Sequence, residues 1–134
     1  KFPTGNVTAD RFLKVASITG SGTTAVGQLS FAEVSGGTSW QAVKTSTFTA
    51  VAGEGYFVNT TSGVITMNLP AGVLGDEIVF IDYAGTFDSN TFTIAANGSE
   101  KINGSTADLT VSVERAANTL VYTDGTQGWL LKTK

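Results

Sequence analysis

Short runs of alternating apolar and polar residues, each ended by glycine or proline, constrain the fold of this chain most. In residues 64–69, Ile65, Met67 and Leu69 fall on one face, and residues 109–114 alternate in the same way. A period of two residues is that of a half-buried β-strand. Helical periodicity is almost absent, and 16 glycines and two prolines divide the 134 residues into short segments. The pattern predicts an all-β domain, either an antiparallel β-sandwich or a barrel-like fold.

The most apolar segment is residues 77–82, where both faces of the expected strand are hydrophobic. Such a strand is expected at the centre of a sheet, buried on two sides. Asn-Gly and Asp-Gly pairs favour the positive φ of tight hairpin turns. The last such pair is expected to join strands 119–123 and 128–132 as a terminal hairpin. The three pairs are Asn97-Gly98, Asn103-Gly104 and Asp124-Gly125.

The first part of the chain differs from the rest in composition. Residues 1–35 are expected to form a shaft-like or connecting segment, and residues 36–134 a compact domain. Within the first segment, residues 12–18 are expected to be one extended strand, and Gly20–Thr24 a loop. Because the chain begins with Lys1 rather than Met, we expect it to be a fragment or a processed product.

The charge and the hydropathy of the chain argue against two classes of partner. The net charge is −3, and only 14% of the residues are charged. The lysines and arginines are scattered singly, so no basic stripe exists to follow the phosphates of a nucleic acid. No apolar run approaches the roughly 20 residues of a membrane-spanning helix. We therefore expect neither nucleic-acid binding nor membrane insertion.

Histidine and cysteine are both absent from the sequence. Ser-His-Asp triads, Cys-His pairs and histidine- or thiolate-bound zinc are therefore excluded. Carboxylates remain, and a glycosidase needs two of them flanking the sugar bond. Asp82, Asp88, Glu100 and Asp108 are the candidates, but these residues are read more simply as solvated loop and turn positions. We predict that the chain is not an enzyme, with no catalytic residues and no cofactor.

Oxygen-rich residues between 82 and 90 raise the question of a calcium site. Asp82, Asp88, Ser89 and Asn90 offer carboxylate, hydroxyl and amide oxygens, which hard cations prefer. The spacing is not that of an EF-hand loop. An Asx-rich turn explains the same residues without a metal. We therefore assign no metal site.

A loop with two aromatic residues gives the stronger indication of binding. In residues 83–90, Tyr83 and Phe87 accompany the short polar side chains of Asp88, Ser89 and Asn90. Aromatic rings stack on the apolar faces of sugars, and short polar groups add hydrogen bonds. The alternative is that both rings fold back to cap the core. Since the loop lacks lysine and arginine, neutral or cationic surface groups are the expected ligands.

Trp40 is a further candidate for ligand binding. It follows Gly36-Gly37-Thr38-Ser39 and is expected at the edge of the compact domain. An indole ring at an edge can stack on a ligand while its N–H group donates a hydrogen bond. Trp129, by contrast, is expected in the core or in an interface between subunits.

From Trp40 to the end, the sequence resembles a domain that recurs in tail-fibre and related adhesion proteins of bacteriophages. Four blocks carry the resemblance, and their order is its main feature. They are WQAVKTSTFTAVAGEGYFVNTTSG (40–63), LPAG to GDEIVFIDYAGTF (69–87), NTFTIAANGSEKING (90–104) and LVYTDGTQGWLL (120–131). The opening residues 5–12 are similar to the shaft repeats of such fibres. The resemblance implies an all-β, homotrimeric distal end of a fibre, exposed outside the virion.

Three functions are compatible with these observations. The first is attachment to a host cell, through shallow recognition of a surface glycan or protein by each subunit of a trimer. The second is a purely structural trimeric knob or decoration, which contacts other virion proteins and no receptor. The third is a glycan-degrading spike, which the short chain without long β-helical repeats disfavours. The sequence favours attachment, and does not identify the host, the receptor or the choice between a tail and a head fibre.

Overall fold

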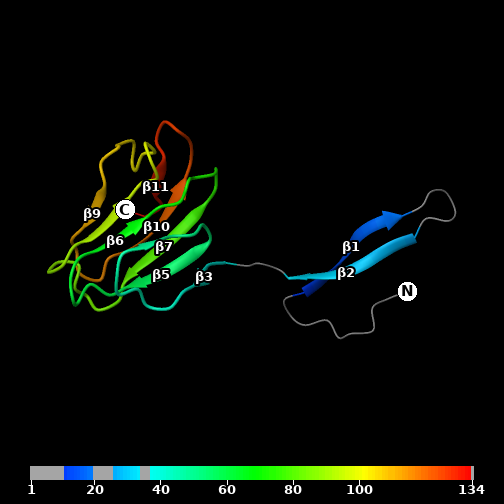
Figure 1. Ribbon diagram of the computed structural model, residues 1–134, viewed down its shortest axis with the longest axis horizontal. Coiled ribbons are helices and arrows are strands. Elements are labelled where there is room, and N and C mark those ends of the chain that lie inside the picture. The colour runs from blue at the N-terminus through cyan, green and yellow to red at the C-terminus, as the bar shows by residue number, and fades with distance from the viewer. Residues whose placement is uncertain (1–10, 20–25, 34–36, 134) are drawn as a thin grey trace. The chain divides into compact units, whose positions relative to one another are not determined.

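The computed structural model describes residues 11–19, 26–33 and 37–133 (Figure 1). Their contacts divide the chain into two units, Lys1–Gly37 and Thr38–Lys134. The first contains β1 (Arg11–Thr19) and β2 (Val26–Glu33), which pair antiparallel with an irregularity between Val15 and Ser17. The extended strand expected at residues 12–18 is therefore confirmed. The expected loop at Gly20–Thr24 and residues 1–10 of the shaft-like opening lie outside the described residues.

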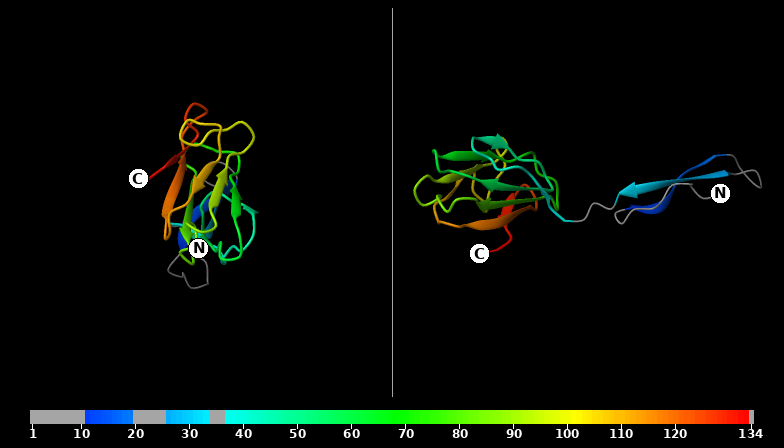
Figure 2. Two further views of the ribbon diagram at one scale, coloured as in Figure 1. Left: turned by 90° about the vertical axis from the view of Figure 1, so that its left-hand side faces the viewer. Right: turned by 90° about the horizontal axis from the view of Figure 1, so that it is seen from below.

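The second unit consists of two β-sheets packed face to face (Figure 2). All described elements are strands, so the described residues hold no helix long and apolar enough to cross a membrane. The five-stranded sheet has the order β11 (Trp129–Leu131), β10 (Ala117–Tyr122), β7 (Glu77–Asp82), β5 (Glu54–Val58) and β3 (Ser39–Trp40). The four-stranded sheet has the order β4 (Phe48–Thr49), β6 (Ile65–Asn68), β8 (Phe92–Ala95) and β9 (Leu109–Val111). The all-β class is confirmed, as a sandwich that does not close into a barrel.

The sheets are mixed, whereas the sequence suggested antiparallel pairing. From β3 to β8 the chain passes to the opposite sheet after every strand. Each strand therefore returns to its own sheet in the same direction as before, and β5–β7 and β6–β8 pair in parallel. Antiparallel pairing occurs where the chain stays in one sheet, at β8–β9 and β10–β11. It also occurs at β7–β10, where the chain returns to the five-stranded sheet after two strands in the other. The alternation of apolar and polar residues along a strand does not reveal such crossovers, because it is the same in parallel and antiparallel sheets.

The core lies between the two sheets. The five-stranded sheet contributes Tyr56, Ile78 and Phe80, and the four-stranded sheet contributes Met67 and Phe92, all fully or almost fully buried. The rings of Phe80 and Phe92 lie 5.3 Å apart in a tilted arrangement. Trp129 belongs to the same cluster. Of the two places that the sequence suggested for it, the core and an interface between subunits, the structure shows the core.

β7 occupies the centre of the five-stranded sheet, as its sequence predicts, but only one of its faces is fully buried. Ile78 and Phe80 point into the core, while Val79 and Ile81 on the other face are half-buried. The outer face of this sheet is apolar, because neighbouring strands contribute similar side chains to it. The outer face is defined by Trp40, Phe57, Val79, Ile81, Val121 and Leu130.

The three expected turns differ from one another. Asn103 and Gly104 both have positive φ, 51° and 76°, and lie between the bridged pair Ile102 and Ser105, so this turn is confirmed. Asp124-Gly125 does join β10 to β11, yet the positive φ falls at Gly128 instead. The Asp124 carboxylate accepts hydrogen bonds from the amides of Thr126 and Gln127, which makes this a longer loop than a two-residue turn. Asn97-Gly98 lies in the connection from β8 to β9.

Replacing a ring in this core tests the position of β7. Phe80→Ala should lower the free energy of unfolding by about 3–5 kcal/mol, because it leaves a cavity between the sheets. Val79→Ala, on the outer face of the same strand, should cost about 1 kcal/mol or less. Urea unfolding of both variants measures the difference. Equal costs would show that β7 does not separate a core face from an outer face.

Candidate functional site

The loop of residues 83–90 begins where β7 ends, and the structure separates its two aromatic residues. Tyr83 is 50% exposed, whereas Phe87 is 0% exposed and stacks on Phe92 at 4.9 Å. Phe87 therefore cannot serve as the stacking platform that the sequence suggested, since its ring fills the core beneath the loop. Asp88 and Ser89 are exposed. Tyr83 keeps the accessibility that a binding role requires.

Trp40 lies on β3, at the edge of the five-stranded sheet, and is 46% exposed. Its ring stacks on Phe57 at 4.9 Å and covers Gly55, where a Cβ atom would meet the indole at 2.7 Å. Trp40 pairs with Gly55, whereas Tyr83 bonds to Val58, three residues further along β5. Three residues of a strand span about 10 Å. The structure therefore places Trp40 apart from the 83–90 loop.

The carboxylate of Asp82 organises the loop. Its side chain is 2% exposed. Oδ1 accepts hydrogen bonds from the amides of Gly85 (3.0 Å) and Thr86 (3.2 Å). Oδ2 accepts from the amides of Phe87 (3.2 Å) and Arg115 (2.9 Å). One buried carboxylate thus ties the loop after β7 to the turn before β10.

These hydrogen bonds decide the ionisation of Asp82. Burial alone would raise the pKa of its carboxyl group, because it disfavours the charged form. The amides of Phe87, Arg115, Thr86 and Gly85 outweigh this effect, and the pKa lies below its ordinary value of 3.8. Asp82 is therefore a carboxylate in the folded protein at neutral pH.

Further hydrogen bonds fix the remainder of the loop. The amide of Tyr83 donates to the carbonyl of Val58 at 2.9 Å. The hydroxyl groups of Thr60 and Thr86 lie 2.8 Å apart. The side-chain amide of Asn90 donates to the carbonyl of Thr60, also at 2.8 Å. Asn90 therefore closes the loop as a structural residue, whereas the sequence suggested a ligand contact.

Arg115 is a residue of this surface that the sequence did not reveal. Its Nη1 donates to the carbonyl oxygen of Tyr83 at 2.9 Å, across 32 positions of sequence. A Cβ atom at Gly85 would meet Arg115 Nε at 2.7 Å, so the guanidinium group lies directly against the loop. Residues 83–90 themselves contain no lysine or arginine, but the fold brings this cation against them from a distant part of the sequence. A positive φ for a non-glycine residue, 59° at Arg115, is the structural feature that accompanies this contact.

The carboxylates considered for glycoside hydrolysis have other roles where their contacts are defined. Asp82 has both oxygens engaged by amides, and Glu100 accepts from the amide of Gly72 at 3.1 and 3.3 Å. Asp88 contacts the hydroxyl of Ser89 at 3.4 Å. Within the described ranges, no three acidic side chains gather in a way that could hold a metal ion. Of the residues considered for calcium, Asp82 is the one whose carboxylate accepts hydrogen bonds from the backbone of the loop.

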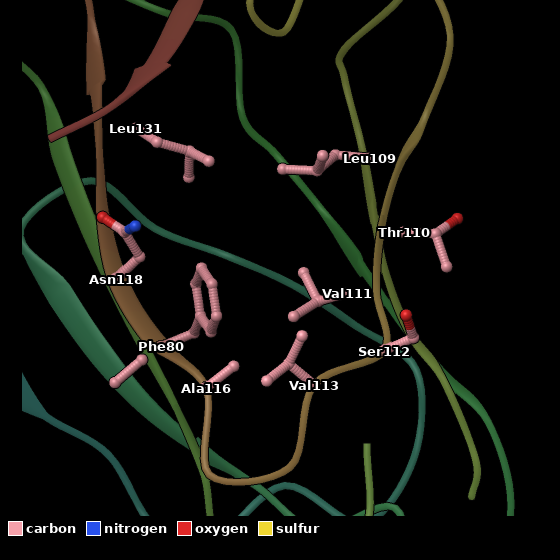
Figure 3. Close-up of a pocket in the computed structure, with 10 residues that line it drawn as sticks. Phe80, Leu109, Thr110, Val111, Ser112, Val113, Ala116, Asn118 and Leu131 are labelled. Atoms are coloured by element: carbon pink, nitrogen blue, oxygen red, sulfur yellow. The ribbon is translucent and has the colours of Figure 1, made fainter. Parts of the chain in front are cut away.

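An apolar groove of about 240 Å³ lies between β9 and β10 (Figure 3). Leu109, Val111 and Val113 face Phe80 and Leu131 across it, while Thr110 and Ser112 point away. No charged side chain lines the groove. Sequence reasoning did not find it, because it forms where an edge strand of one sheet faces an inner strand of the other.

Comparisons with known proteins support the broader part of the resemblance, a structural protein of a phage virion. Residues 6–127 match the model of a family described as Bacteriophage T4 gp9/10-like protein, N-terminal. A curated relative is the baseplate wedge protein gp10 of Enterobacteria phage T4, which is 35% identical over 79 residues. The match covers 57% of this chain and 13% of the relative, so the chain spans a small part of that protein.

The Asp82 carboxylate can be tested by an isosteric change. Asp82→Asn places an NH2 group against backbone donors, which should lower the free energy of unfolding at pH 7 by about 2–4 kcal/mol. Since its folded-state pKa is lowered, Asp82 stabilises the fold above pH 4 and loses this effect as the pH falls further. The wild type should therefore lose stability below pH 4 more steeply than Asp82→Asn.

Asp88→Asn is the matched control, because Asp88 is exposed and accepts no backbone hydrogen bond among the described residues. Chemical unfolding at several pH values measures both variants. Equal stability of the two variants at pH 7 would rule out the structural role of Asp82.

Proposed function

The chain belongs to the bacteriophage T4 gp9/10-like family, and from this premise we propose that it attaches the virion to the host surface through the loop that carries Tyr83. Family membership makes it a structural component of a phage virion. The finer proposal is a distal fibre domain that recognises a glycan or protein on the cell. Attachment of this kind requires exposure outside the particle and no insertion into a membrane.

One observation supports this proposal most directly: the half-exposed Tyr83 belongs to a loop whose backbone is held by hydrogen bonds to a buried carboxylate. Tyr83 is 50% exposed, while the next residues of its loop are held by the buried Asp82. A rigid loop loses little conformational entropy when it binds, and aromatic side chains contribute large contact area at low entropic cost. The loop is therefore preorganised for ligand binding.

We further propose that the domain performs no catalysis. The sequence contains neither histidine nor cysteine. The buried carboxylate beside the candidate surface, Asp82, is engaged by four amides and held in its ionised form, so it is not available as a general acid. Binding needs only the exposed side chains of this surface, and it needs no cofactor.

A homotrimer would make shallow recognition effective. A stacking contact is worth about 0.5–1.5 kcal/mol beyond area burial, which is weak for a single copy. Linked copies turn the later contacts into intramolecular ones and can raise avidity by about 10²–10⁴. Light scattering on the intact chain tests the assembly, with three copies expected and a stable monomer at micromolar concentration contradicting it.

The outer face of the five-stranded sheet favours a second candidate function, a structural knob. Of the six apolar side chains that define this face, Trp40 is 46% exposed and the other five are half-buried within the Thr38–Lys134 unit. Contiguous exposed apolar patches commonly mark protein–protein contacts. A partner on this face could be another copy or another virion protein, as the baseplate name of the relative suggests. Nothing in the surface charge favours nucleic acid.

Adsorption to host cells distinguishes the two functions. Tyr83→Ala should reduce the binding of the purified protein to the host by roughly 2- to 10-fold per copy, because the stacking surface is lost. The melting temperature should be unchanged, since half of the tyrosine lies in solvent.

Leu74→Ala provides the matched control. Leu74 is 77% exposed and precedes β7, so it lies at the end of the sheet opposite the 83–90 loop. Its replacement should leave adsorption unaltered. Full adsorption by Tyr83→Ala would remove the loop from the attachment surface and favour the structural knob.

A further inference from the structure

The guanidinium group of Arg115 is held in a defined place beside the proposed attachment loop. Its Nη1 donates to the carbonyl of Tyr83 at 2.9 Å, and Gly85 leaves the space in which the group lies. The backbone amide of Arg115 is itself fixed by Asp82 at 2.9 Å. The backbone and the guanidinium group of Arg115 are thus both held by hydrogen bonds to residues 82 and 83, although Arg115 is exposed to solvent.

The positive charge of Arg115 is not neutralised by a neighbouring carboxylate in the part of the chain that the structure describes. The ion pair found there joins Lys132 and Glu77 at 3.4 Å, on the surface of the five-stranded sheet. A guanidinium group has five N–H donors, and the carbonyl of Tyr83 engages Nη1 alone. The buried carboxylate of Asp82 bonds to the backbone of Arg115 and leaves the remaining guanidinium donors available.

The backbone of Arg115 adopts a conformation that glycine would adopt at no cost. Its φ is 59°, in the left-handed region that side chains other than glycine and asparagine seldom enter. Strained positions of this kind cluster at binding and catalytic sites, where an observed outlier supports a functional hypothesis. The arginine side chain here is tolerated against a local conformational cost.

We propose that Arg115 and Tyr83 together bind an acidic sugar residue, through its carboxylate or phosphate group. The planar fork of a guanidinium matches both groups in a bidentate arrangement. The exposed ring of Tyr83, one residue after the buried Asp82, offers the sugar an apolar surface. This inference rests on the proposed attachment function and replaces the expectation of a neutral or cationic ligand.

The specificity of this site would be local. The chain carries a net charge of −3, so its overall field does not attract anions. An acidic ligand would be drawn only where a fixed cation stands without a paired carboxylate. This distinguishes the site from the exposed Lys132, whose charge is already shared with Glu77.

Two substitutions separate ligand binding from a purely structural role of Arg115. Arg115→Gly suits the positive φ and removes the guanidinium group, so the fold should be retained while the anion contact is lost. Arg115→Lys keeps the charge and loses the fork. Lys132→Gln is the control, because it removes a cation from a site that lacks an exposed tyrosine loop.

The experiment follows the amide signals of the intact chain by NMR during titration with three probes. These are methyl β-glucuronide, its neutral counterpart methyl β-glucoside, and glucose 6-phosphate, each at the same ionic strength set with sodium chloride. We expect the acidic probes to shift the amides of residues 83–90 and 113–116. Binding should weaken by roughly 10- to 100-fold in Arg115→Gly, as for the loss of a charged hydrogen bond. Arg115→Lys should fall between, and Lys132→Gln should match the wild type.

Each outcome decides a separate point. A stronger response to the glucuronide than to the phosphate assigns a carboxylate ligand, and the reverse order assigns a phosphate. Equal responses to the acidic and neutral sugars, full binding by Arg115→Gly, or no response of the wild type to any probe would overturn the inference. If host adsorption still depends on Tyr83 in that case, the attachment function stands without the acidic ligand. If adsorption is independent of Tyr83 as well, both proposals fail.

Discussion

The buried carboxylate of Asp82 is the interaction on which the candidate surface depends. A charge in the protein interior is costly unless it is hydrogen-bonded, and here four backbone amides satisfy it. Three of these amides belong to the loop after β7, and the fourth belongs to the turn before β10. The same group therefore shapes the loop, fixes Arg115 beside it, and joins two segments that lie far apart in the sequence.

Sheet topology explains why these two segments meet. β7 and β10 are antiparallel neighbours, with Ile81 opposite Ala117. The C-terminal end of β7 and the N-terminal end of β10 consequently lie at the same end of the sheet. The loop that follows β7 is thus brought against the turn that contains Arg115. Phe87, four residues after the exposed Tyr83, fills the core beneath this loop.

The sequence predicted the parts of the fold that depend on local pattern. The strand bounds of β7 follow from its apolar run. The single-faced burial of β6 follows from alternation, and the terminal hairpin from its turn residues. Parallel pairing could not be predicted, because alternation is the same in both kinds of sheet. The sequence left two alternatives open for Phe87, and Arg115 was not predicted, for a related reason. Whether the ring of Phe87 points inward depends on how it packs against Phe92 in the core. The contacts of Arg115 with the loop span more than 30 residues of sequence.

Amide hydrogen exchange tests the central claim most directly, because it reports each donor to Asp82 separately. Opening of a hydrogen-bonded segment must precede exchange. The amides of Gly85, Thr86, Phe87 and Arg115 should exchange far more slowly than an exposed loop amide such as that of Ser62, and should lose this protection together in Asp82→Asn. Exchange of these four amides as fast as that of Ser62 in the wild type would contradict the account.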